Sequence, residues 1–227
     1  MQLLVKNGVL FYYLKSKNMP RKEADVAYKP EIERKFLVRS FPIEVLRGRE
    51  CYWIQQAYPR FKRGIRVREK LRNPYIQPPA SISSVPDGPT IISEEWQGTI
   101  TMKARANNND WRTQIECESP IDLEFVREFS KGAPGVRKAR YVIGRFELDI
   151  YTSPQLRGLV VMEIELKNAA EQVYIPDGFD VVEVTEDQRF RSASLARLKT
   201  RKAMLELLRK YGIALKEDGQ NDRANNR

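Results

Sequence analysis

The sequence predicts a mainly β protein with antiparallel strands and few helices. Segments in which charged and apolar residues alternate recur along the chain, as expected for strands with one charged and one apolar face. Turns rich in Pro, Gly, Asn or Asp separate most of these segments. Few stretches repeat apolar residues at helical spacing. Together these observations favour an antiparallel barrel or a sandwich of two sheets.

The predicted strands are short and follow one another from about residue 28 to residue 212. They span residues 31–38, 51–58, 64–71, 96–105, 111–118, 138–150, 158–167 and 179–191. The stretch 107–110, NNND, predicts a hairpin turn between two of them. Residues 72–94 are rich in Pro and Ser and predict a long loop.

Three stretches are predicted to be helical. Residues 120–131 begin with Pro after a Ser cap and stop at Gly132. Residues 168–174 predict a short helix. Residues 192–211 carry Leu and Met at helical spacing and are followed by Gly212, so they predict a long C-terminal helix.

The chain divides into three parts. Residues 1–27 look like an appended segment of low order, residues 28–212 form one domain, and residues 213–227 are a polar tail. The apolar run near the N-terminus is short and interrupted, so neither a signal peptide nor a membrane span is expected. Cys51 and Cys117 have neither metal-like spacing nor a disulfide pattern. A reducing cytoplasm is therefore the expected location.

Composition narrows the chemistry. Forty Lys and Arg against 30 Asp and Glu give a net charge of +10, which favours an anionic partner. The chain has no His, which excludes Ser-His-Asp hydrolases, Cys-His proteases and His-ligated metals. A general base must then be a Lys, a carboxylate, a Tyr or a metal-bound water.

Charged doublets at spacing two recur in almost every predicted strand, with apolar residues between them. Acidic doublets lie at 31–33, 147–149 and 163–165, and basic doublets at 66–68, 138–140 and 189–191. Spacing two places each doublet on one face of its strand. In a sandwich that face would meet water, the commoner arrangement. In a closed sheet that face would line a lumen. Such a lumen is electrostatically unfavourable when it is empty, because its charges are crowded and partly desolvated, but it suits a polyanion with metal cations. The dominance of Arg and Glu in matched doublets favours the lumen.

Motifs along the chain carry a family resemblance. EIERKFLV at 31–38 resembles the ExExK signature of the CYTH superfamily, the triphosphate tunnel metalloenzymes. Further motifs follow in the order found in that family: QQAY (55–58), IRVRE (65–69), ITMKA (100–104), RTQIE (112–116), KARY (138–141), FELDIY (146–151), MEIEL (162–166) and EVTEDQRFRSASLA (183–196). The resemblance covers roughly residues 28–200. It implies an eight-stranded antiparallel closed β-barrel with covering helices, whose tunnel is lined by charged side chains.

The resemblance also implies an activity. Members of this superfamily act on triphosphates with a divalent metal, so we expect a metal-dependent triphosphatase with Mg²⁺ or Mn²⁺, two ions in all. Inorganic tripolyphosphate is the favoured substrate. A thiamine or nucleoside triphosphatase, a class IV-type adenylate cyclase and a non-catalytic triphosphate or nucleotide sensor are the alternatives. No stable nucleic-acid partner and no membrane are expected. The family often forms dimers, which leaves a homodimer open.

Roles follow by residue type and by resemblance. The expected metal ligands are Glu31, Glu33, Glu116, Asp149, Glu163 and Glu165. The expected phosphate-binding residues are Lys35, Arg66, Arg68, Lys103, Arg140, Arg189 and Arg191. Lys138 is the candidate general base or water-positioning residue, because burial beside other cations lowers the pKa of a Lys. Tyr58 either orients the terminal phosphate or packs in the barrel wall.

The sequence departs from the family pattern in places. Gln114 stands where a glutamate is usual, which removes one potential metal ligand. Ala193 or its neighbour stands where a small polar Asn is usual, and the loop at 72–94 is longer than in compact members. Trp96 and Trp111 could stack a base, although packing at the barrel edge is the expected role. These departures bear on the substrate rather than on the reaction class.

Overall fold

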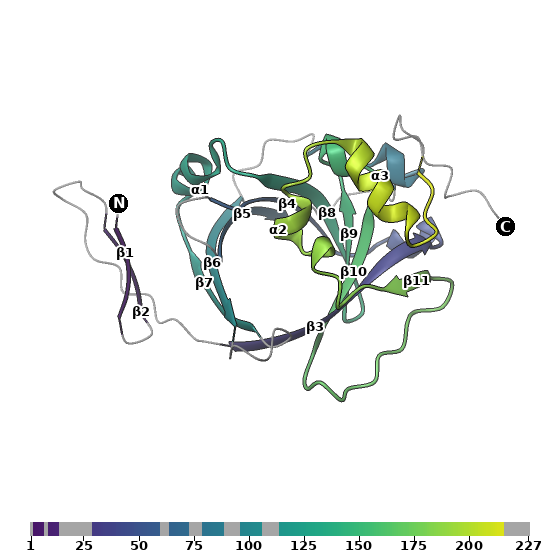
Figure 1. The fold of residues 1–227 in the computed structure, drawn as a ribbon, viewed down its shortest axis with the longest axis horizontal. Coiled ribbons are helices and arrows are strands. Elements are labelled where there is room, and N and C mark those ends of the chain that lie inside the picture. The colour runs from purple at the N-terminus through teal and green to yellow at the C-terminus, as the bar shows by residue number, and fades with distance from the viewer. Residues whose placement is uncertain are drawn as a thin grey trace.

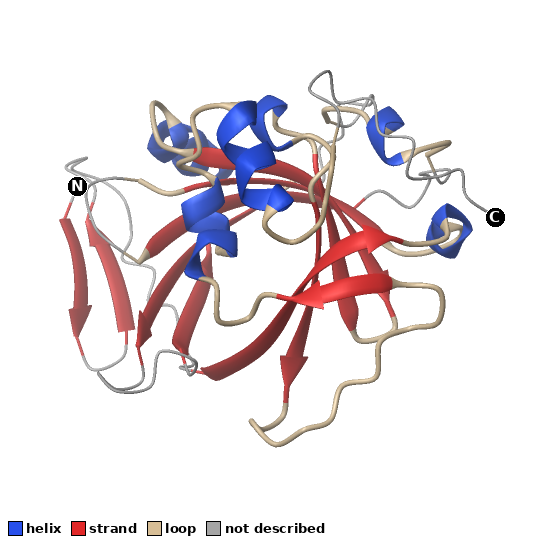
Figure 2. Cartoon of the chain, turned by 45° about the vertical axis from the view of Figure 1, so that its right-hand side comes forward, coloured by secondary structure: helices blue, strands red, loops and turns tan. Residues whose placement is uncertain are grey.

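The computed structural model describes residues 2–6, 9–13, 29–59, 64–72, 79–88, 96–105 and 114–215. Most of the described chain forms one curved antiparallel sheet with helices on its outer side (Figures 1 and 2). The predicted turn at 107–110, Trp111, and residues 216–227 of the predicted tail lie outside the described residues. The predicted class, mainly β and antiparallel with few helices, is confirmed.

Two sheets are present among the described residues. The smaller one pairs β1 (Gln2–Lys6) with β2 (Val9–Tyr13), within the predicted appended segment. The larger one has nine strands: β3 (Lys29–Ser40), β4 (Cys51–Ala57), β5 (Ile65–Arg72), β6 (Gln97–Arg105), β7 (Gln114–Pro120), β8 (Gly135–Ile143), β9 (Phe146–Tyr151), β10 (Val160–Leu166) and β11 (Asp180–Glu183). Their order is β10-β9-β8-β4-β5-β6-β7-β3-β11.

Strand β3 is the longest strand and links distant parts of the large sheet. Its first residues pair with β7, and its last residues pair with β11. Residues 32–37 of β3 also pair with β10, the strand at the opposite end of the order. In this register Lys35 lies opposite Glu163, and Glu33 lies opposite Glu165. The charged motif of β3 therefore faces the acidic doublet of β10.

Two predicted strands are wrong in extent. Residues 138–150 form the hairpin of β8 and β9, because the chain reverses at Gly144, whose φ of 61° suits glycine. Only Asp180–Glu183 of the segment 179–191 is a strand. Beyond it the Asp187 side chain accepts a hydrogen bond from the backbone N–H of Arg189, which favours the 3₁₀ turn η4 (Gln188–Phe190) instead of a strand.

The helices are shorter than predicted. The first, α1, covers Leu123–Ser130, within the predicted 120–131. The predicted helix 192–211 is two helices, α2 (Ser192–Leu195) and α3 (Arg201–Arg209). They are separate because Thr200 caps α3 by accepting a hydrogen bond from the N–H of Ala203. Residues 168–174 contain no helix, so that prediction was wrong. Three other 3₁₀ turns are η1 (Ile43–Leu46), η2 (Ile82–Ser84), within the predicted loop, and η3 (Pro154–Leu156).

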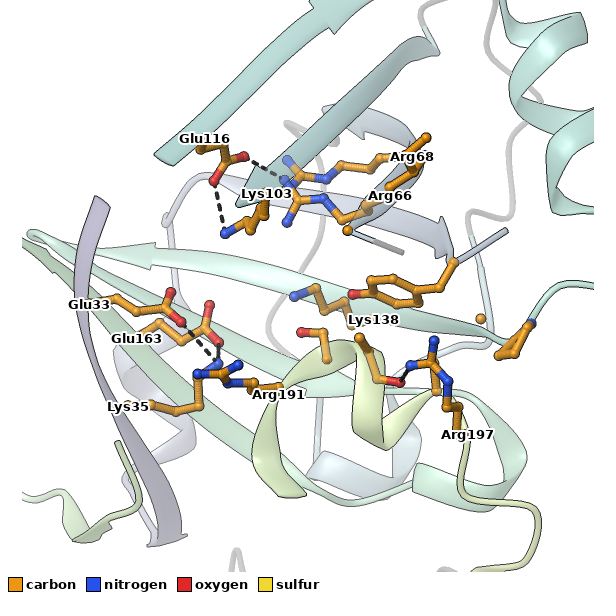
Figure 3. Close-up of a pocket in the computed structure, with 18 of the residues that line it drawn as sticks. Glu33, Lys35, Arg66, Arg68, Lys103, Glu116, Lys138, Glu163, Arg191 and Arg197 are labelled. Carbon is orange, nitrogen blue, oxygen red and sulfur yellow. Dashed lines mark hydrogen bonds and ion pairs between the residues drawn. The ribbon is translucent and has the colours of Figure 1, made fainter. Parts of the chain in front are cut away.

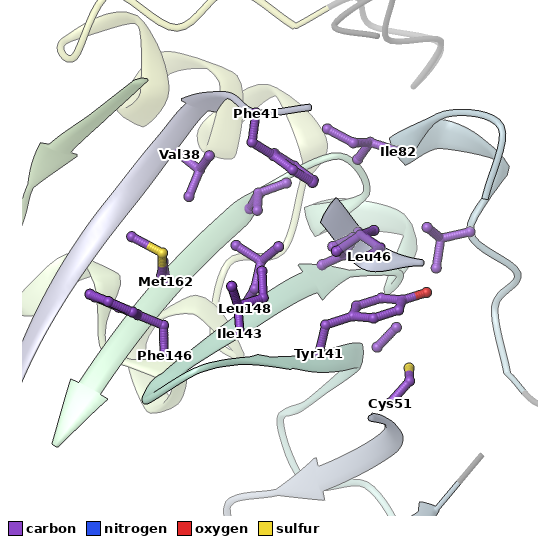
Figure 4. Packing of buried hydrophobic residues seen from close by; sticks show 14 of the residues in the cluster. Val38, Phe41, Leu46, Cys51, Ile82, Tyr141, Ile143, Phe146, Leu148 and Met162 are labelled. Carbon is purple, nitrogen blue, oxygen red and sulfur yellow. The ribbon is translucent and has the colours of Figure 1, made fainter. Parts of the chain in front are cut away.

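The apolar face of the sheet forms the core. Side chains from η1, η2 and the strands pack together on one part of it, including Phe41, Leu46 and Tyr141 (Figure 4). Helices α2 and α3 cover another part, where Met204 is fully buried. Because neighbouring residues of a strand point to opposite faces, the charged doublets lie on the other face. Among the described residues, no helix is long and apolar enough to cross a membrane.

Candidate active site

A cavity of about 1740 Å³ lies on the charged face of the sheet. Ten basic residues of the described chain line it: Lys35, Arg66, Arg68, Lys103, Lys138, Arg140, Arg145, Arg191, Arg197 and Lys199. Seven described acidic residues also line it: Glu31, Glu33, Glu116, Glu118, Glu147, Glu163 and Glu165. The doublets 31–33, 66–68, 138–140 and 163–165 thus face a cavity, as the lumen interpretation expects. Figure 3 shows the side chains converging from several strands.

One group of charges lies where β3 pairs with β10. Lys35 Nζ is 2.6 Å from Glu163 Oε1 and 3.5 Å from Glu33 Oε1 (Figure 3). Burial lowers the pKa of Lys35, but Glu163 and Glu33 outweigh it and raise that pKa well above its usual value. The same ion pairs lower the pKa of Glu163 against the effect of its burial. Glu33 faces Glu165 directly across the two strands, an arrangement of like charges that is destabilising without a cation.

A second group joins β3 to β5, β6 and β7. Lys103 Nζ lies 2.5 Å from Glu31 Oε2 and 2.8 Å from Glu116 Oε2. Arg66 adds a contact of 2.9 Å to Glu116. Burial, reinforced by Glu33 and opposed by Lys103, raises the pKa of Glu31 to about 7. Burial would also raise the pKa of Glu116, but Lys103 and Arg66 lower it to about 2. Glu31 is therefore the carboxylate of this group that lacks enough positive charge.

Arg66 and Arg68 retain unused hydrogen-bond donors. The Nε atoms of both residues are buried, and neither has a hydrogen-bond partner among the described residues. The nearest carboxylate to Arg68 is Glu118, at 3.9 Å from its terminal nitrogen. Burial and the neighbouring Arg66 lower the pKa of Arg68 to about 10. Buried donors without partners are rare, and here they belong to two guanidinium groups that can bind oxyanions with two parallel hydrogen bonds.

Lys138 and Arg140 share one buried carboxylate. Arg140 donates from Nε and from a terminal nitrogen to the two oxygens of Asp149, at 2.7 Å each. Lys138 also donates to Asp149, whose side chain is fully buried. Burial and Arg140 lower the pKa of Lys138 to about 8, although Asp149 and Glu163 oppose the shift. The direction of this shift agrees with the prediction for a general base.

Asp149 does not line the cavity, although it was predicted as a metal ligand. Both of its oxygens accept hydrogen bonds from Lys138 and Arg140. Asp149 therefore holds the side chains of Lys138 and Arg140 in position.

Tyr58 lines the cavity and also contacts the surrounding core. Gln56 Nε2 donates to the Tyr58 hydroxyl at 2.7 Å. Burial raises the pKa of Tyr58, while Arg66 and a hydrogen bond with Ser192 lower it in part. The ring packs against the apolar cluster under α2 and α3. Both roles considered for Tyr58 are therefore compatible with its position.

Arg189 is outside the cavity, unlike its predicted partner Arg191. Its guanidinium is exposed and binds Asp187 at 2.5 Å. The two arginines lie in and just after η4, where spacing two does not place side chains on one face. Sequence reasoning missed Arg145, Arg197 and Lys199, which line the cavity from turns and a helix end and therefore carry no strand signal. Trp96 packs against the core, the expected role.

The carboxylates suit a hard divalent cation by donor type. Glu31, Glu33 and Glu165 supply oxygen ligands from two adjacent strands, and oxygen ligands are those that Mg²⁺ and Mn²⁺ prefer. The raised pKa of Glu31 indicates that nearby positive charge does not offset the burial of this carboxylate. Within the described ranges, no three such side chains already converge as a formed metal site.

Comparison with known proteins gives matches among solved structures. A structure of the hypothetical protein NE1496 is 27% identical, covers 73% of this chain and 97% of its own, and has a TM-score of 0.42. A structure of the inorganic triphosphatase NE1496 is 26% identical, covers 75% of this chain and 96% of its own, and has a TM-score of 0.43. The chain resembles an inorganic triphosphatase.

No family model and no curated protein matches the chain. Because TM-scores below 0.5 reflect only a partial overlap of backbones, the function proposed below is based on the residues of the cavity.

Proposed function

We propose that this protein is a divalent-metal-dependent triphosphatase, with inorganic tripolyphosphate as the favoured substrate. We further propose that the large sheet is a closed eight-stranded barrel, and that the cavity is its lumen. The pairing of β10 with β3 supports closure, because it joins the first strand of the order to the eighth. The ninth strand, β11, pairs with the last residues of β3 and would lie outside this ring. The acids and bases of this lumen would meet a substrate and its metal ions together.

The observation that supports this function most strongly is the pair of buried guanidinium groups with unused donors. Among the described residues, the Nε atoms of Arg66 and Arg68 have no hydrogen-bond partner, while other charged groups around them are paired. A phosphate chain would supply acceptors for these donors. Lys35, Lys103 and Arg140 line the same cavity and would bind further phosphate oxygens.

The metal would be held at the acidic part of the cavity. Glu31, Glu33, Glu163 and Glu165 are the proposed ligands, with Glu116 as a further candidate, for Mg²⁺ or Mn²⁺ and two ions in all. When bound, such an ion neutralises phosphate oxygens that would otherwise repel the carboxylates. Gln114 cannot add a carboxylate to this set.

Hydrolysis then needs a water, a base and a leaving group. The water oxygen attacks the terminal phosphorus, the anhydride P–O bond breaks, and diphosphate leaves. Lys138 is the proposed acceptor of the water proton at Nζ, because its pKa of about 8 leaves a neutral fraction near neutral pH. Arg66 and Arg68 bind the phosphate chain and stabilise the charge that develops on it.

The test is orthophosphate release from purified protein. Tripolyphosphate, ATP, GTP and thiamine triphosphate are compared in parallel with Mg²⁺, with Mn²⁺ and with EDTA. We expect metal-dependent release that is fastest with tripolyphosphate. Faster orthophosphate release from another triphosphate would make that compound, instead of tripolyphosphate, the proposed substrate. Consumption of ATP that yields pyrophosphate but no orthophosphate would identify a cyclase. Binding without any release would identify a sensor.

A further inference from the structure

One segment that lines the cavity is basic and contains no acidic residue. Residues 191–199, RSASLARLK, contain three basic residues and no Asp or Glu. All of them except Ser194 and Leu195 line the cavity. We call Arg197 and Lys199 the basic mouth. Both side chains are exposed, whereas Lys35, Lys138 and Arg140 of the same cavity are buried.

Local packing places these two side chains toward the cavity. Leu195 and Ala196 are buried in the core under α2 and α3, and Leu198 packs against the same cluster. The residues between and after them, Arg197 and Lys199, are left on the side of the cavity. Arg197 donates to the carbonyl of Ala193, which holds the guanidinium beside α2 (Figure 3). Among the described residues, the guanidinium of Arg197 thus donates to a backbone carbonyl rather than to a carboxylate.

Other contacts place Ser192, near the start of the same segment, next to Tyr58. Ser192 hydrogen-bonds with the Tyr58 hydroxyl, and the Tyr58 N–H donates to the carbonyl of Pro134 at 2.9 Å. The lining residues in this region, 132–135 and Gln155, are all uncharged. The carboxylates Glu33 and Glu165 lie instead on the paired strands β3 and β10. The cavity therefore carries its acidic groups and its basic mouth on different elements.

The cavity is also larger than a triphosphate requires. Its volume of about 1740 Å³ exceeds the roughly 300–1,000 Å³ of ordinary small-molecule sites. Space and charge beyond the catalytic groups suit a longer anion of the same chemistry.

We propose that the basic mouth is a further anion subsite, which binds the phosphates of a linear polyphosphate beyond the three held inside. This proposal rests on the proposed function, since it assigns the inner cations to a triphosphate. Arg197 and Lys199 would contact the fourth and later phosphates. Among linear inorganic polyphosphates, the protein then binds chains longer than tripolyphosphate more tightly, while tripolyphosphate stays the favoured substrate among the triphosphates.

The test measures binding and turnover as a function of chain length. Tripolyphosphate, tetrapolyphosphate and a longer linear polyphosphate are titrated calorimetrically into the full chain in EDTA at fixed ionic strength. The ratio of kcat/KM for long over short chains is measured with Mg²⁺. The variant is the double substitution Arg197→Ala and Lys199→Ala. The matched control is Lys202→Ala and Arg209→Ala, which removes two exposed basic residues of α3 that do not line the cavity.

We expect the wild type to bind the longer chains about threefold to tenfold more tightly than tripolyphosphate, the effect of two exposed ion pairs. The double variant should lose this preference, and the control should keep it. Equal preferences in wild type and double variant would overturn the subsite, as would the same loss in the control.

Failure of the proposed function would give a different result. If no substrate is hydrolysed but the calorimetric preference for long chains depends on the basic mouth, the subsite stands and the triphosphatase does not. If tripolyphosphate is hydrolysed but Arg197 and Lys199 do not strengthen the binding of longer chains, the triphosphatase function stands and the subsite does not. If no phosphate chain binds at all, both are overturned.

Discussion

Substitution of Arg68 by Met should reduce activity without harming the fold. The Arg68 side chain is 14% exposed, and its Nε has no partner among the described residues. Met keeps most of the apolar volume and removes the charge. In the free protein this relieves the desolvation of a buried cation that has only a distant carboxylate, so the melting temperature should stay constant or rise. This separates the effect of Arg68 on the substrate from any effect on folding.

The loss in activity follows from the hydrogen bonds that Arg68 would make to phosphate. A hydrogen bond involving a charged group contributes about 1.5–3 kcal/mol, which corresponds to roughly 10- to 150-fold in kcat/KM. The assay is initial-rate orthophosphate release over a range of tripolyphosphate concentrations, with Mg²⁺ in excess. Thermal unfolding of the same samples gives the stability.

Arg72→Met is the matched control, because Arg72 belongs to the same strand but is 66% exposed and pairs with Glu50 at 3.1 Å. It should leave kcat/KM within about twofold of wild type, since an exposed pair contributes little. Equal activity of Arg68→Met and wild type would refute the assignment of Arg68 to phosphate. A melting temperature several degrees lower for Arg68→Met would show that Arg68 is a structural residue.

Three further substitutions test separate parts of the site. If neutral Lys138 is the base, activity should rise as pH increases through about 8, where the lysine loses its proton, and Lys138→Met should abolish this rise in a pH–rate profile. Asp149→Asn should destabilise the fold by about 3–5 kcal/mol in urea unfolding, because it leaves two buried cations without their carboxylate. The same variant should move the pH–rate rise to lower pH, since Asp149 raises the pKa of Lys138, and an unchanged profile would show that Asp149 does not act on Lys138. Glu31→Gln should increase the Mg²⁺ concentration needed for half-maximal activity while triphosphate still binds by calorimetry, and an unchanged metal requirement would remove Glu31 from the ligand set.

The parts of the site that lie on regular strands could be predicted from the sequence. Arg66 and Arg68 alternate with the buried Ile65 and Val67, so a spacing of two was enough to place both guanidinium groups on one face. The sequence could not show whether this face met water or a cavity. That depends on long-range pairing such as β10 with β3, which no local pattern encodes.

The parts on turns could not be predicted in the same way. Arg189 and Arg191 are two residues apart, as on one face of a strand. The Asp187 side chain instead stabilises a 3₁₀ turn, in which Arg189 is exposed and pairs with Asp187. The leucines of 192–211 have helical spacing throughout, so the sequence did not reveal that the helix is interrupted before Thr200, which caps α3. For the same reason the position of Arg197 at the cavity was not predicted. Asp149 has the residue type of a metal ligand, but its register opposite Arg140 places it in a buried ion pair.

The most direct test of the central claim is phosphorus NMR of tripolyphosphate incubated with the purified protein and Mg²⁺. Hydrolysis of the terminal anhydride in the charged cavity predicts equal amounts of orthophosphate and pyrophosphate, no reaction in EDTA, and a strongly reduced rate for Arg68→Met. Unchanged tripolyphosphate in the presence of Mg²⁺ or Mn²⁺, or the same rate for wild type and Arg68→Met, would contradict the claim.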